Sequence, residues 1–264
     1  MHALRRPKHT DRGAILLHTL VLVALASGLV MLVLVSARRS EDGFALLNKR
    51  LAEQLRVESA VAQVMLDLID SGARARWLKN PGAAQFAGAG AEAIEIRVVD
   101  VRGLVDLNAA KPELIERIVP TSRRSSLRTG NAWLPGQRRR FDDYATFAAA
   151  YGLSASDLVC LHASLTLFSG LITPDPLLMP AAVARNLGQS SSHGGASTAS
   201  AIEDIRPTIG RTYKLISRYL SGDSNSETLV VEFYLTGRTD RPYLMRSWVW
   251  LPTPGKDRTC IGDR

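Results

Sequence analysis

An uncharged apolar segment near the N-terminus constrains this fold more than any other feature of the chain. Residues 14–35 contain no charged side chain, and their only polar members are His18, Thr19 and Ser27. At about 1.5 Å per residue, a helix over this segment spans the ~30 Å hydrocarbon core of a bilayer. No other part of the sequence is comparable, so we expect a single transmembrane helix over residues 14–35.

The charges beside this segment set the expected topology. The residues before it are mostly basic: Arg5, Arg6, Lys8 and Arg12, with Asp11 as an opposing acid. Positive flanks stay in the cytoplasm, so we expect a single-pass inner-membrane protein with a cytoplasmic N-terminus and a periplasmic head. Arg38 and Arg39 follow the span and weaken the asymmetry.

Three interpretations of this N-terminus differ in where the chain would be cut. A secretory signal peptide could be cleaved after Ala37, but the apolar run exceeds the roughly 7–15 residues usual for such a signal. An uncleaved signal anchor is the second interpretation. The third is a prepilin-type leader over residues 1–13, with Gly13 as its last residue and Ala14 as the new N-terminus. The third interpretation keeps the whole apolar helix on the mature protein.

The helical pattern continues beyond the membrane. Leu47, Leu51 and Leu55 follow at steps of four, Val61 resumes the step after an offset, and no proline occurs between Pro7 and Pro81. We therefore expect one helix from about 14 to 71, weakest at Gly43, whose amphipathic part covers residues 36–72. The stripe of Leu47, Leu51, Leu55 and Val61 should pack on the sheet of the head, or alternatively face a partner.

The remaining sequence predicts an antiparallel sheet interrupted by helices. Strands are expected over 93–101, 104–107, 212–220, 228–236 and 242–250, and helices over 112–119, after a cap at Asp142, from Ser154 to about Leu167, and over 181–187. Residues 82–90 and 122–140 should be loops. The expected divisions are 73–108 and 212–252 for the sheet domain, 109–187 for an inserted helical domain, 188–211 for a linker and 253–264 for a tail. The fold class is therefore α+β.

The two cysteines leave the disulfide question open. An oxidising periplasm would permit Cys160 and Cys260 to pair. Sequence spacing does not show that their Cα atoms come within bonding distance. We expect them to be unpaired, with Cys160 as a small core residue and Cys260 as a thiol of the tail.

Several segments, taken together and in order, resemble one protein family. They are Arg12-Gly13 with the apolar run behind it, Gly103-Leu104-Val105-Asp106-Leu107-Asn108-Ala109-Ala110, Phe141-Asp142-Asp143-Tyr144-Ala145-Thr146-Phe147, Leu165-Thr166-Leu167-Phe168-Ser169-Gly170, and Arg241-Pro242-Tyr243 with Ser247-Trp248. Across nearly its whole length the chain resembles general secretion pathway protein K, the minor pseudopilin K of type II secretion systems. This chain looks shorter than usual members, mostly within the helical insertion.

The resemblance implies a pilin-like body and a set of partners. A member of this family would be cut by the prepilin peptidase after Gly13, N-methylated at Ala14, and assembled with the I and J minor pseudopilins at the tip of the pseudopilus. Most pilin-like subunits carry glutamate at mature position five, and the K subunit is the exception. Counting from Ala14, that position is His18 here, although His18 could also be merely a tolerated polar residue. The family's head can hold calcium, but no acidic run with ligand spacing is evident, so we expect no metal ligands and no cofactor.

Two other function classes are disfavoured. No nucleophile motif or phosphate-binding glycine loop occurs, so we expect no enzyme activity. Residues 108–114 resemble the opening of a helix-hairpin-helix motif with arginines downstream, which would suit a DNA-uptake or type IV pilus minor pilin that binds DNA. The glycine-rich hairpin of that motif is missing, and a formal charge of +8 does not by itself indicate nucleic acid.

Overall fold

The computed structural model describes residues 10–88, 90, 93–119, 140–188, 209–220 and 227–252. The chain divides into two compact units, Met1–Gln54 and Leu55–Arg264. The predicted leader up to residue 9, most of the arginine-rich loop, most of the linker and the tail from 253 lie outside the described residues. The second unit contains the sheet, the inserted helices and the last turns of the long helix.

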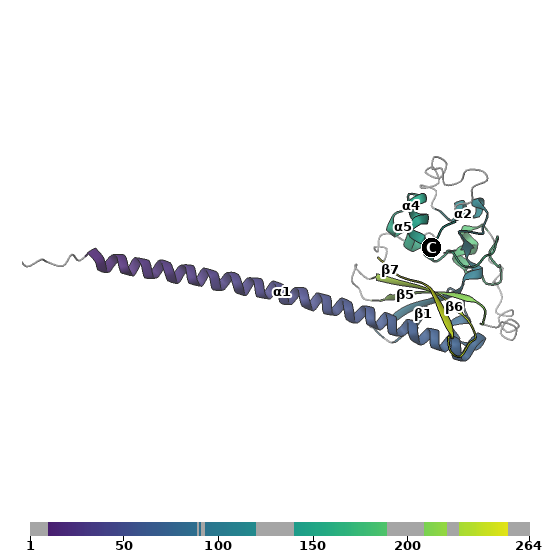
Figure 1. Ribbon diagram of the computed structural model, residues 1–264, viewed down its shortest axis with the longest axis horizontal. Helices are drawn as coiled ribbons and strands as arrows, with labels where there is room; N and C mark the ends of the chain where they lie inside the picture. The colour runs from purple at the N-terminus through teal and green to yellow at the C-terminus, as the bar shows by residue number, and fades with distance from the viewer. Residues whose placement is uncertain are drawn as a thin grey trace, which may run out of the picture. The chain divides into compact units, whose positions relative to one another are not determined.

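The long N-terminal helix, α1, covers Thr10–Ser71 without interruption (Figure 1). It starts four residues before the predicted position and ends at the predicted residue. Gly72 follows with φ of +57°, a left-handed conformation that glycine adopts without strain and that commonly ends helices. Gly43, the expected weak point, lies within the unbroken helix, because one glycine costs only about 1 kcal/mol against many good helix formers.

A five-stranded antiparallel sheet forms the centre of the second unit. Its strands are β1 Gln85–Ala87, β2 Ile94–Asp100, β5 Thr212–Tyr219, β6 Glu227–Leu235 and β7 Tyr243–Pro252, in the order β1-β2-β5-β6-β7. The predicted meander of the last three strands is confirmed. The prediction of a loop over 82–90 was wrong in part, because β1 pairs with β2 there as a short edge strand. Three residues are too few to show a hydrophobic alternation.

The helices inserted between β2 and β5 are short. They are α2 Pro112–Ile118, α4 Tyr144–Ala150, α5 Ala155–His162 and α6 Ala181–Asn186. The capping box of α5 between Ser154 and Asp157 is present as predicted. The cap of α4 is Asp143, whose carboxylate accepts from Thr146 N at 2.6 Å, and not the predicted Asp142. That hydrogen bond lowers the pKa of Asp143.

A two-stranded parallel sheet replaces two elements that the sequence suggested. The strand β3, Val105–Asp106, was expected in the antiparallel sheet, but it pairs in parallel with β4, Leu165–Thr166. The helix α5 was expected to run to about Leu167, but it ends at His162 because β4 takes up the following residues. Both corrections depend on a pairing between distant segments, which local periodicity does not reveal.

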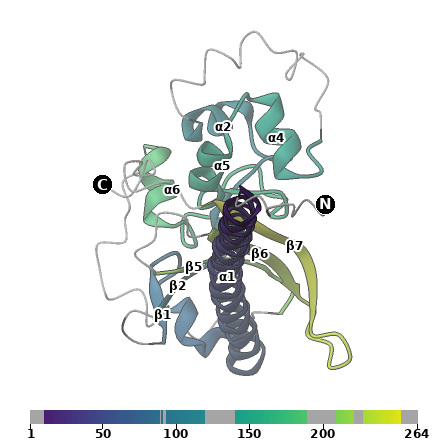
Figure 2. The same cartoon turned by 90° about the vertical axis from the view of Figure 1, so that its left-hand side faces the viewer.

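The large sheet lies between the end of α1 and the inserted helices (Figures 1 and 2). Each of its faces covers its own hydrophobic core. One face packs on α1, where Val57, Val61, Val64 and Leu68 are buried against β2, β5 and β6. The other face meets the inserted helices, and that core contains Val99 of β2. The predicted α+β fold, a long helix packed on an antiparallel sheet with inserted helices, is therefore confirmed.

The expectation for the cysteines was wrong. Cys160, on α5, is disulfide-bonded. The second cysteine of the sequence, Cys260, lies outside the described residues. Whether two cysteines pair depends on their distance in the fold, which sequence spacing alone does not give.

Candidate functional site

The first half of α1 presents an exposed apolar surface. It belongs to the one helix of the described residues that is long and apolar enough to cross a membrane. The two hydroxyls within residues 14–35 are satisfied by the helix backbone: Thr19 Oγ1 donates to Leu16 O at 2.9 Å and Ser27 Oγ donates to Val23 O at 2.8 Å. Satisfying polar groups internally is what a hydrocarbon environment requires. This surface suits lipid or another apolar helix.

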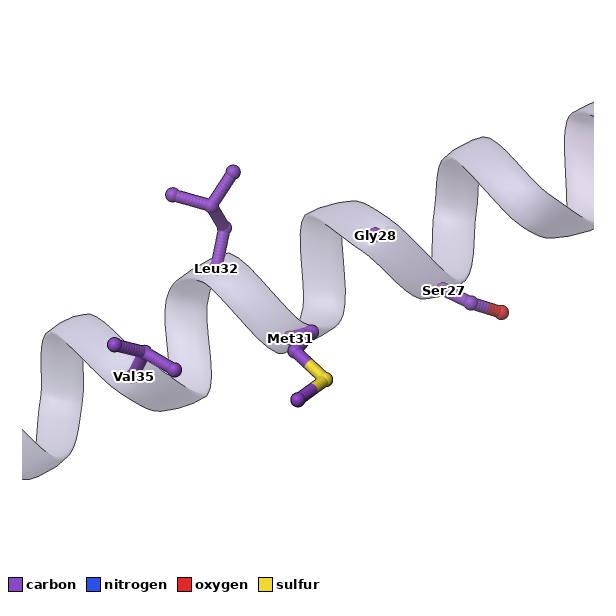
Figure 3. Close-up of a pocket in the computed structure, with 5 residues that line it drawn as sticks. All are labelled: Ser27, Gly28, Met31, Leu32 and Val35. Carbon is purple, nitrogen blue, oxygen red and sulfur yellow. The ribbon is translucent and has the colours of Figure 1, made fainter.

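A shallow groove on this helix has no reactive or free polar side chain (Figure 3). It is lined by Ser27, Gly28, Met31, Leu32 and Val35. Gly28 contributes no side chain to it, and a Cβ at that position would meet nothing within 4 Å. Its single hydroxyl already donates to the helix backbone, so the groove has no free donor or nucleophile.

The predicted processing residues lie at the beginning of α1. Gly13 and Ala14 are within the helix, and the structure does not describe their side chains. His18 lies one turn further on and is exposed. The structure contains no peptidase and no neighbouring subunit, so the roles of cleavage, methylation and the position-five exception stay predictions.

The residues of the predicted packing stripe of α1 do not share one environment. Leu47, Leu51 and Leu55 are 60%, 54% and 56% exposed, and only Val61 is buried against the sheet. For Leu55 the reason is the phase of the helix, whereas Leu47 and Leu51 precede Val57, the first residue of α1 in the core under the sheet. Six residues separate Leu55 from Val61, which at 100° each corresponds to a rotation of about 240° and places them on different faces. The alternative that the sequence left open, a partner-facing surface, fits the three exposed leucines.

The residues that contact the sheet begin about one turn before Val61. They are Val57, Ala60, Val61, Val64, Met65 and Leu68, all less than 9% exposed. Their spacing of three and four gives a continuous apolar stripe. A buried aliphatic side chain of this size contributes about 1.5–3 kcal/mol. This stripe fixes the end of α1 on the head.

A buried polar cluster fixes the inserted helices on the opposite face of the sheet. Lys214 of β5 and Glu232 of β6 are fully buried, with Lys214 Nζ 3.3 Å from Glu232 Oε1. Tyr144 of α4 donates its hydroxyl to Glu232 Oε1 at 2.7 Å and accepts from Lys214 Nζ at 3.1 Å. Lys214 also donates to Leu165 O at 2.7 Å, and Thr166 Oγ1 donates to Glu232 Oε1 at 3.3 Å. The cluster therefore joins β4, β5, β6 and α4.

His162 of α5 packs its ring against this cluster without making a hydrogen bond to a described residue through either ring nitrogen. Its ring centre lies 4.2 Å from that of Tyr144, and neither ring nitrogen has a hydrogen-bond partner among the described residues. Burial, followed by the charge of Lys214, holds the pKa of His162 well below its usual value of 6.5. The imidazole is therefore neutral near pH 7 and would add an uncompensated charge if it were protonated in place.

We expect His162 to make the head less stable in mild acid. Its pKa is lower in the folded than in the unfolded protein, so the unfolded state binds more protons below about pH 6.5. Stability from this group is complete above that pH and is lost as the pH falls toward the folded pKa. Replacing His162→Phe should reduce the loss of unfolding free energy between pH 7.5 and 5.5 by about 1 kcal/mol. Urea titrations at both pH values measure this, and parallel pH dependence of the two proteins would contradict it.

Two polar residues of the Gly103–Ala110 segment hold loops together. Asp106 is 1% exposed, and its carboxylate accepts from the backbone of Asn108, Ala109 and Gly170 and from Ser169 Oγ. The side chain of Asn108 accepts from Phe141 N at 2.7 Å and donates to Phe141 O at 3.0 Å. The sequence indicates the segment but not its contacts with Phe141, Ser169 and Gly170, because those partners are more than thirty residues away.

These contacts bear on the metal and nucleic-acid alternatives. No group of three or more His, Cys, Asp or Glu side chains within the described ranges could hold a metal ion. The carboxylate of Asp106 accepts four hydrogen bonds, and those of Asp143 and Asp157 cap helices. Most of the arginines of the DNA-binding alternative lie in 120–139, outside the described residues.

Comparisons with known proteins add one similar structure. No family model and no curated protein matches the chain. The chain is similar to one in the crystal structure of the GspK-GspI-GspJ complex from the enterotoxigenic Escherichia coli type 2 secretion system, with 13% sequence identity and a TM-score of 0.40. The match covers 80% of this chain and 98% of that chain. At this identity and TM-score the similarity decides no role for the chain, so the function depends on its own residues and contacts.

Proposed function

We propose that this protein is a minor pseudopilin of the K type, which assembles at the tip of a type II secretion pseudopilus. The observation that carries the proposal is the use of α1. One unbroken helix is apolar and exposed in its first part, while its last turns are buried against an antiparallel sheet. A helix of this kind anchors a subunit in a membrane and can pack beside equivalent helices. A signal peptide would have no need of the continuation.

The proposed topology follows from charge and chemistry. The basic residues before the span favour a cytoplasmic N-terminus and a periplasmic head, with α1 in the inner membrane. The disulfide of Cys160 suits that oxidising compartment. Prepilin peptidase would cut between Gly13 and Ala14, and Ala14 would be methylated.

The proposed partners are the I and J minor pseudopilins, as the sequence resemblance implies. The exposed Leu47, Leu51 and Leu55 of α1 offer an apolar surface for neighbouring helices. His18, in place of an acidic residue at mature position five, leaves this subunit unable to neutralise the N-terminal amine of another. Its own amine could still be matched by a neighbour, which suits a position at the tip. The role is a scaffold, and it requires neither a cofactor nor catalysis.

The intact mass of the membrane-extracted protein tests this proposal. We expect the loss of residues 1–13 and an N-terminus at Ala14 when the protein is produced with the host prepilin peptidase, and the full chain when the peptidase is absent. A mature chain that begins at Arg38, after cleavage behind Ala37, would mean a secreted protein and overturn the proposal. With processing at Ala14, copurification with the I and J subunits then tests the subunit identity.

A further inference from the structure

The sheet is wider than the single helix that covers one of its faces. Neighbouring strands lie about 4.8 Å apart, and a helix with its side chains is about 10 Å across. One helix therefore covers about two or three strands, and this sheet has five. The core under α1 includes residues of β2, β5 and β6, while β7 contributes only the half-buried Trp250 at its margin. The α1 face of β7 is left largely uncovered by the described residues.

Four large apolar side chains lie on that uncovered face. In the strand register, Tyr243, Met245, Trp248 and Trp250 are opposite Leu235, Phe233, Val231 and Leu229. The four β6 residues belong to the core under α1, so their β7 partners point to the same side. Yet Tyr243, Met245 and Trp248 are 39%, 41% and 39% exposed. We call these four β7 residues the β7 shelf.

A β-bulge places all four residues of the β7 shelf on the same face of the sheet. The register shifts between Glu232 and Phe233, so that Glu232 is opposite Ser247, Phe233 is opposite Met245, and Arg246 is the extra residue. Without the bulge, side chains would alternate strictly and Tyr243 and Met245 would lie on the other face from Trp248 and Trp250. Arg246 instead places its guanidinium near the rings of Phe168 and Tyr234. The strand thus departs from regular geometry in a way that gathers apolar groups on the exposed face.

The shape and chemistry of the shelf favour a helix as its occupant. The shelf contains no charged residue, continues the core under α1 through Trp250, and lies on the same face of the sheet as α1. Aromatic and methionine side chains of this kind are enriched where proteins bind each other. The chain itself shows what such a helix would offer: Phe44, Leu47 and Leu51 of α1 are each more than half exposed.

We propose that the β7 shelf binds the amphipathic helix of a neighbouring pilin-type subunit, laid beside α1 on the same face of the sheet. The identity of this partner rests on the proposed function. The helix would bury its apolar stripe on Trp248 and Met245, and its polar face would remain in water. The head would then hold its neighbour by a contact separate from the packing of helices within the membrane.

Photo-crosslinking in cells that make the complete secretion system tests the shelf. The photoreactive residue p-benzoylphenylalanine is placed at position 248 of the full chain, and in a matched control at position 249. Val249 is equally exposed, at 37%, but it is paired with Val230 and so points to the opposite face. We expect crosslinks from position 248 to the N-terminal helix of another pseudopilin, identified by mass spectrometry, and none to that helix from position 249.

Three outcomes would overturn the inference. They are crosslinks from position 248 to residues 253–264 of the same chain, crosslinks to a partner's strand, and equal yields from the two positions. In addition, Trp248→Ala should reduce the recovery of the partner roughly tenfold, because truncating a central aromatic contact is costly. The N-terminal mass is measured in the same cells. Processing at Ala14 without a crosslink rejects the shelf alone, whereas absence of processing rejects the proposed function.

Discussion

Replacing Glu232→Ala is expected to lower the free energy of unfolding by about 3–5 kcal/mol. The change removes the carboxylate that pairs with the fully buried ammonium of Lys214. Burial already lowers the pKa of Lys214, and Glu232 opposes that shift. Without Glu232, folding must either bury an unpaired charge or release its proton. The hydroxyls of Tyr144 and Thr166 would lose their acceptor as well.

The measurement is urea denaturation of the full chain in detergent, followed by tryptophan fluorescence. Trp77 is 2% exposed in the core under α1 and reports on the head. An exposed ion pair gives the control: Arg238 and Asp240 lie 2.8 Å apart with side chains 71% and 65% exposed. Arg238→Ala should leave the midpoint within experimental error, because water already screens that pair.

A double variant separates the loss of the pair from the loss of a polar group. In Lys214→Met with Glu232→Gln, both charges are removed and an acceptor for Tyr144 remains. Replacing a buried ion pair by neutral groups of similar volume is often nearly neutral, so at least half of the stability should return. If the double variant is as unstable as Glu232→Ala, an unpaired buried charge is not the cause of the lost stability.

The burial of this cluster could not be predicted from the sequence. The strands β5 and β6 were predicted correctly. Lys214 and Glu232 alternate with apolar residues along them and so lie on the more polar face of the sheet. A polar face normally points to water. Here the inserted helices cover it, so the two charges are buried and must pair. Which face an insertion covers is set by contacts between distant segments, and no local pattern in the sequence records it.

The long helix likewise has an extent that the local sequence predicts and a contact face that depends on distant segments. Its continuity followed from the absence of proline, and it ends at Ser71 in front of a glycine with positive φ. The face by which α1 contacts the sheet did not follow from the sequence. The steps of four from Leu47 to Leu55 looked like a packing stripe, but the sheet begins to cover the helix only at Val57. An apolar stripe shows that something must cover it and does not say whether a sheet, a lipid or a second subunit does so.

Gly103 belongs to one of the segments that resemble the family, and it lies where two backbone segments come close together. Gly103 ends a short 3₁₀ turn, Val101–Gly103, between β2 and β3. The segment that precedes α6 crosses the turn at this point, with Asp175 N donating to Arg102 O at 2.8 Å. A Cβ on Gly103 would fall on the backbone carbonyl of Leu178 and 2.9 Å from Met179 N. Only a residue without a side chain allows the two backbones to lie this close.

Gly103→Ala is therefore expected to destabilise the head by about 3 kcal/mol, at the upper end of overpacking effects. The clash is with backbone, so no side-chain rotation relieves it, and Leu178 and Met179 would have to leave their buried positions. Gly43→Ala is the matched control, because a Cβ there meets nothing within 4 Å and alanine is the better helix former. It should leave the urea midpoint of the head unchanged. An unchanged midpoint for Gly103→Ala would instead mean that the segment at Leu178 can move away from the turn at little cost, and that the close approach does not hold the insertion on the sheet.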